Sequence, residues 1–138
     1  SRVVREVKET LDERRDVVIR WAESQRSAEE TKKSGRSMGL GDDEIRKQIL
    51  EVLGEISLAI VNSVEVGGMV LTGGDTAFAV YKALNIHETK VEKEVLPGIP
   101  ALRFIRGKAD EIRVVTKAGA FGDENALVTA IEYLRERT

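Results

Sequence analysis

The stretch GMVLTGGDTAFAVYKALN, residues 68–85, places two glycines and an acid between an apolar run and a helical pattern. The run at 68–73 is short and apolar, which is typical of a buried strand. A helical segment, 76–85, begins directly behind Gly73 and Gly74. A strand followed at once by a helix is the building unit of α/β domains. The stretch therefore predicts an α/β fold with a tight glycine turn at the end of a strand.

Helical and strand patterns alternate on both sides of this stretch. Apolar residues recur at helical spacing in 2–14, 42–65 and 126–137. Short apolar or alternating runs predict strands or extended segments at 16–22, 88–95, 101–106 and 111–117. Together these patterns predict one layered α/β/α domain over residues 1–138, with a mixed sheet that is mostly parallel.

The segment 23–41 contains serine, glycine and charge without a sustained period. It is either a loop or a short helix with flexible ends, and structureless connections of this length are usually functional or disordered. Its cations Lys32, Lys33 and Arg36 are either a solvated run or a group that folds over bound phosphates. Behind them, the two aspartates at 42–43 are expected to cap the long helix.

Composition excludes several classes of partner. Lys and Arg (22) nearly balance Asp and Glu (24), so no strong field favours nucleic acid or anionic lipid. Aromatic residues make up 4% of the chain, too few for a base-stacking platform. The chain has no cysteine, and no apolar run approaches the ~20 residues that span a bilayer. We therefore expect a cytoplasmic protein without nucleic-acid or membrane partners.

Two glycine-bearing turns follow predicted strands, TGGDTA at 72–77 and KAGAFGDE at 117–124. In open α/β sheets ligands bind at the carboxyl ends of the strands, where such turns gather. Glycine lets a ligand approach the backbone, and the following helix start offers unpaired N–H groups, a combination that suits phosphate. Neither turn matches the P-loop or the dinucleotide-binding pattern. The alternative is that Asp75 or Thr76 caps the helix and the glycines only make a tight turn.

Three segments also resemble one enzyme family. They are VLTGGDTAFAVYKAL (70–84), VLPGIPALRF (95–104) and VVTKAGAFGDENALVTAIEYL (114–134). They are similar to the C-terminal nucleotide-binding domain of the four-carbon acid sugar kinases, the D-threonate and D-erythronate kinase-like family. The shared features are a GG-acid-T-A turn, a PG-x-P segment and a K-(S/A)-G-x-F-G turn, in this order. The resemblance implies an enzyme of carbohydrate metabolism that uses ATP with Mg²⁺ and phosphorylates a sugar acid held between two domains.

The resemblance also implies which residues would contact the nucleotide, ATP or ADP. They are Gly73, Gly74, Asp75, Thr76, Lys117, Gly119 and Gly122. The amides would bind phosphates, Lys117 would neutralise charge, and Asp75 would reach a magnesium-bound water or a ribose hydroxyl. Trp21 is expected either to pack or to contact adenine. No residue is assigned as the catalytic base, and none as a direct metal ligand.

Parts of the family pattern do not occur in this sequence. They are the N-terminal domain with its aspartate-rich motif and the glycine-serine strand end that opens the nucleotide domain. We therefore expect an ATP-binding domain that phosphorylates nothing alone, whose sugar acid is held by a further domain, and whose pairing as a homodimer is open. Two alternatives remain: a non-catalytic module that binds a phosphorylated metabolite through helix N-termini, and a scaffold whose glycines only turn the chain.

Overall fold

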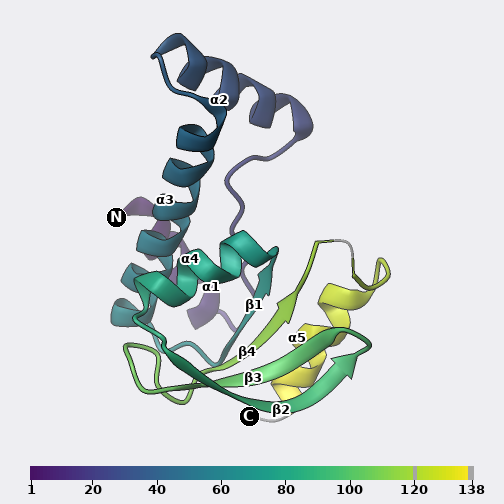
Figure 1. Cartoon of the computed structure of the whole chain (residues 1–138). Coiled ribbons are helices and arrows are strands. Elements are labelled where there is room, and N and C mark those ends of the chain that lie inside the picture. Colours follow the sequence, from purple (N-terminus) through teal and green to yellow (C-terminus); the bar gives the residue numbers. More distant parts are fainter. Residues whose placement is uncertain (120, 137–138) are drawn as a thin grey trace.

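The computed structural model describes residues 1–119 and 121–136, which form five helices and one four-stranded sheet (Figure 1). The helices are α1 (Arg2–Asp12), α2 (Gln25–Ser37), α3 (Asp42–Ser63), α4 (Gly74–Ala83) and α5 (Ala126–Glu136). The strands are β1 (Gly68–Thr72), β2 (Glu88–Leu96), β3 (Ile99–Ile105) and β4 (Arg113–Lys117). None of these helices is long and apolar enough to cross a bilayer.

The sheet has the strand order β1-β4-β3-β2 and is mixed. The α/β class is confirmed, but the expectation that the sheet is mostly parallel is wrong. Only β1 and β4 run parallel, whereas β4 with β3 and β3 with β2 are antiparallel. The reason is local: β2 and β3 are joined by a tight turn at 97–98, so the chain returns at once instead of crossing over through a helix.

Two hydrophobic cores lie on opposite faces of the sheet, which confirms the three layers. On β4, Val114 belongs to the core under α4 and Val115 to the core under α5, because successive strand residues point to opposite faces. The α4 core contains Val80, Leu84, Ile86, Leu102, Phe104, Ala109 and Val114. The α5 core contains Ile99, Ala101, Val115, Ala126, Ala130 and Leu134. Arg113 is also buried, and its guanidinium donates to the Leu134 carbonyl at 2.7 Å, near the end of α5.

The predicted strand at 16–22 is not a strand. The segment has no place in the sheet, and its side chains are largely outside the core: Val18 is 80% exposed and Trp21 42% exposed. An apolar run forms a strand only where a neighbouring backbone completes its hydrogen bonds, and strand propensity depends strongly on that context. Here the apolar side chains instead line a shallow groove with α1 and α3, beside Val7 and Val52.

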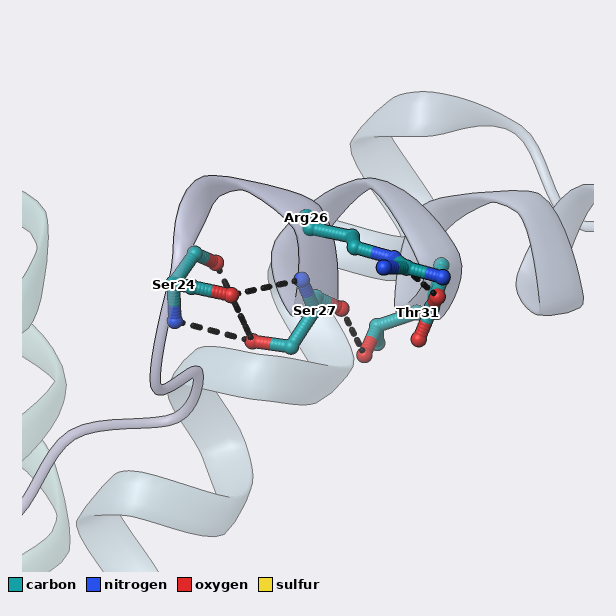
Figure 2. A network of polar contacts seen from close by, with 5 residues as sticks. Ser24, Arg26, Ser27 and Thr31 are labelled. Carbon is teal, nitrogen blue, oxygen red and sulfur yellow. Dashed lines mark hydrogen bonds and ion pairs between the residues drawn. The ribbon is translucent and has the colours of Figure 1, made fainter.

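The open question at 23–41 is resolved by helix α2, which covers most of the segment. Figure 2 shows its first turn, where Ser24 and Ser27 form a reciprocal capping box. The Ser24 hydroxyl accepts from the Ser27 amide at 3.1 Å, and the Ser27 hydroxyl accepts from the Ser24 amide at 3.0 Å. No residue of α2 is buried, so the cap and pairs such as Arg26 with Glu30 supply stability that apolar packing does not.

Helices α2 and α3 form a hairpin that stands out from the sheet (Figure 1). A side chain on Gly35 would lie 2.7 Å from Ile45 Cγ1, so glycine allows the two helices to approach closely. Arg36 donates to Asp42 at 2.9 Å across the connection. The expectation that Asp42 or Asp43 caps α3 is wrong, because the N-cap is Gly41 and no side chain caps the helix. The two acids lie in the first turn, where negative charge favours the helix dipole.

Candidate functional site

The two glycine turns lie side by side at one edge of the sheet. Strands β1 and β4 are parallel neighbours, with Thr72 opposite Lys117, so their carboxyl ends meet. The Gly73 amide donates to the Lys117 carbonyl at 2.8 Å and joins the two turns directly. This is the strand-end arrangement at which α/β sheets bind ligands.

The first glycine turn, at residues 72–77, exposes three backbone amides. Gly73 is the N-cap of α4, with φ 89° and ψ 135°, a conformation that favours glycine. The Gly73 amide already donates to the Lys117 carbonyl of β4. The unpaired N–H groups at the start of α4 are therefore those of Gly74, Asp75 and Thr76. Neither Asp75 nor Thr76 caps the helix through its side chain, which removes the capping interpretation. A methyl group on Gly74 would meet no atom within 4 Å, and residues 73–76 line an open cleft.

The second turn combines a packing glycine with an open one. Gly122 has φ 85°, and a side chain there would lie 2.7 Å from Ala126 Cβ. Gly119 faces open space. The Lys117 ammonium is folded back over this turn and donates to the carbonyls of Ala118 and Gly119, both at 3.1 Å. A phosphate at this turn would have to attract that ammonium away from neutral carbonyls, which are weaker acceptors than an anion.

The third motif, the proline-bounded segment, lies against the second turn. The Phe121 ring is 3.5 Å from the position that a side chain on Gly98 would take, at the β2–β3 turn. All three motifs are therefore contiguous in space, although they are far apart in the sequence. The ring of Phe121 is itself half exposed.

A cleft of about 550 Å³ opens in front of the first turn. Its walls are the turn residues 73–76, Trp21 from the extended segment, and side chains of α2 and α3. Lys117, Gly119 and Gly122 do not line this cleft, so the structure divides the predicted site into a cleft part and an adjoining turn. The volume is within the usual range of small-molecule sites, about 300–1,000 Å³.

Ion pairs cross the cleft. It is lined by three cations, Lys32, Arg36 and Arg46, and by three carboxylates, Asp42, Asp43 and Asp75. Arg46 contacts Asp43 at 3.2 Å and Asp75 at 3.9 Å. The hydrogen bond from Arg36, more than its charge, holds the pKa of Asp42 below its usual range. These pairs are more than half exposed, and exposed pairs contribute little stability, so a stronger anion can replace them.

Sequence reasoning missed Arg46, because a lone arginine in a helix carries no positional signal.

The described residues contain no group of three acids or histidines that could hold a metal ion. Mg²⁺ does not require such a cage, because it usually keeps several waters and is bound by one or two carboxylates together with substrate phosphates. Asp75, exposed beside the free amides, fits that role. The residues present are therefore compatible with magnesium that is carried by a nucleotide.

The fold is that of an α/β domain with two glycine turns at the ends of parallel strands, and comparison with known families gives its class. The family described as the nucleotide-binding C-terminal domain matches residues 1–127, and the chain belongs to it. The predicted resemblance is thereby confirmed.

Individual relatives carry kinase names. The chain is 37% identical over 93 residues to a D-threonate kinase of Salmonella typhimurium, covering 67% of this chain and 22% of that protein. It is 30% identical over 136 residues to a D-erythronate kinase of Heliobacterium modesticaldum, covering 97% of this chain and 31% of that protein. The chain thus spans less than a third of either relative.

A solved structure shows the same fold. It is a domain of unknown function from Bordetella bronchiseptica, crystallised as a domain-swapped dimer with bound citrate. The TM-score is 0.65 at 27% identity, and the match covers 98% of this chain and 37% of that chain.

Proposed function

We propose that this chain is the ATP-binding domain of a sugar-acid kinase that transfers the γ-phosphoryl group of ATP to a four-carbon acid sugar. The observation that carries the proposal is the hydrogen bond from Gly73 to Lys117, which holds two glycine turns together at the ends of parallel strands. Membership of a nucleotide-binding family and relatives named D-threonate and D-erythronate kinases support it.

Each part of the proposed site has a task in phosphoryl transfer. The amides of Gly74, Asp75 and Thr76 bind phosphate oxygens, and the open backbone at Gly119 approaches the nucleotide from the other turn. Lys117 exchanges its carbonyl partners for phosphate and neutralises charge. Mg²⁺ supplies further charge neutralisation when bound with the phosphates. Positioning and charge stabilisation are most of what this reaction asks of a protein.

The proposal includes partners beyond the chain. The sugar acid is held by a further domain, so this chain alone binds ATP or ADP weakly and phosphorylates nothing. A homodimer is part of the proposal, and a related structure that is a domain-swapped dimer supports it. The proposed location is the cytoplasm, where ATP is available.

A titration with magnesium-ATP, followed by backbone amide NMR, tests the proposal. We expect shifts concentrated at Gly73, Gly74, Gly119 and Gly122. Gly74→Val should abolish binding while the fold is retained, because the new side chain fills the open space in front of the amides. Gly67→Val is the matched control, since its substituent also meets no atom within 4 Å and it lies ahead of β1, at the far end of that strand from the turn. Unchanged affinity of Gly74→Val would refute the proposal.

A thermal-shift panel separates the kinase domain from a metabolite-binding module. A kinase domain is stabilised most by ATP or ADP with magnesium, whereas a metabolite sensor is stabilised most by a sugar phosphate. Stabilisation follows the ratio of ligand concentration to Kd, so equal concentrations rank the ligands. If no phosphate compound stabilises the protein, the glycines only turn the chain.

A further inference from the structure

We propose that Arg46 of α3, together with Lys32 and Arg36 of α2, forms the second wall of the phosphate site and binds the polyphosphate part of the nucleotide. The proposal rests on the function proposed above and adds residues from a part of the chain that none of the three motifs covers. Its basis is that these three cations and the free amides at 74–76 line one cleft.

Arg46 is the cleft cation that forms an ion pair with a residue of the first glycine turn. Its guanidinium lies 3.9 Å from the Asp75 carboxylate, and Asp75 is one of the three residues whose amides are free. An anion bound to those amides is therefore within reach of Arg46. The guanidinium is planar and can donate two parallel hydrogen bonds to phosphate oxygens.

The present partners of Arg46 do not prevent this exchange. The contact with Asp75 is at the limit of an ion pair, and the side chain of Arg46 is 64% exposed. When Arg46 turns to phosphate, Asp75 loses a competing cation and is left to accept from a water of magnesium. The cleft carries as many carboxylates as cations, so an added anion with its own Mg²⁺ disturbs the charge balance little.

The proposal also explains why a helix without buried residues is held in place. Lys32 and Arg36 are four positions apart on α2 and therefore lie on one face, which lines the cleft. Lys33, the next residue, does not line it. The close contact of Gly35 with Ile45 and the hydrogen bond from Arg36 to Asp42 fix this face relative to α3. No residue of α2 is buried, and its cleft-facing side carries the cations Lys32 and Arg36.

The test measures binding of three ligands: ATP, AMP and inorganic tripolyphosphate. Trp21 is the chain's single tryptophan and lines the cleft, so its fluorescence reports occupancy. Loss of a charged hydrogen-bond donor predicts that Arg46→Ala weakens ATP and tripolyphosphate binding by about tenfold or more. AMP binding should change far less. Lys33→Ala and Arg26→Ala are matched controls on α2 and should leave all three affinities unchanged.

The outcomes separate this inference from the proposed function. If ATP binds with the expected amide shifts and Arg46→Ala keeps wild-type affinity for ATP and tripolyphosphate, the second wall is refuted and the function stands. If tripolyphosphate binding depends on Arg46 but ATP produces no shift at Gly119 or Gly122, the second wall stands and the nucleotide function is overturned. If neither ligand binds the wild-type chain at millimolar concentration, both are overturned.

Discussion

Alanine at the two adjacent glycines of the first turn should have opposite effects on stability. At Gly73 the backbone has φ 89°, and no atom lies closer than 3.7 Å to an added side chain, so the cost is strain alone. Such strain costs about 1–3 kcal/mol, offset by about 0.4–1 kcal/mol from the stiffer unfolded chain. Gly74 lies inside α4 without a positive φ, and alanine there should stabilise the fold by about 0.4–1 kcal/mol.

Differential scanning calorimetry measures both effects. For a domain of this size, 1 kcal/mol shifts the melting temperature by roughly 3–5 °C, so the strain of about 1–3 kcal/mol should separate the two variants by roughly 3–15 °C. Gly74→Ala should also lose nucleotide affinity, because its methyl group occupies the space where phosphate oxygens approach the amides. Gly67→Ala is the control for both readouts. Melting temperatures that move in the same direction, or wild-type affinity in Gly74→Ala, would refute the reasoning.

The remaining predictions concern stability. Arg113→Ala leaves the carbonyl of Leu134 without its buried donor and should lower the free energy of unfolding in urea by about 1–3 kcal/mol. The exposed Arg26→Ala should lower it little, and similar unfolding midpoints for the two variants would contradict this. The pKa of Asp42 is lower in the folded state, so its pair with Arg36 stabilises above about pH 4 and is lost as the pH falls through the folded-state pKa. In Asp42→Asn the melting temperature should fall less steeply between pH 5 and pH 3 than in the wild type. An unchanged dependence of the melting temperature on pH in this range would disprove the prediction.

Local sequence patterns were sufficient to predict the secondary structure around the first glycine turn and at the β2–β3 pair. The strand at 68–72, the helix behind it and the β2–β3 pair were predicted because apolar period, glycine and proline agree there. Helix α4 begins two residues earlier than predicted, because Gly74 takes a helical conformation when Gly73 supplies the turn. The meeting of the two turns was predicted from their places after strands.

Tertiary context decided the rest. The apolar run at 16–22 reads as a strand, and only the absence of a pairing partner in the described structure makes it coil. Helix α2 lacks an apolar period and is defined by the serine cap at Ser24 and by contact with Ile45, which no periodicity reveals. The proposed role of Arg46 depends on a cleft formed by the extended segment, α2, α3 and the turn at 73–76, and such a cleft is visible only after folding.

The hydrogen bond between Gly73 and Lys117 also constrains how the protein folds. The whole of α4 and the β2–β3 hairpin separates these residues along the chain, so closing this contact costs considerable loop entropy. Domains that are rich in contacts of such long range fold more slowly. The two turns meet only once β1 has paired with β4. A nucleotide that binds both turns would therefore stabilise chains in which β1 and β4 are paired over chains in which they are not, and would couple ligand binding to folding.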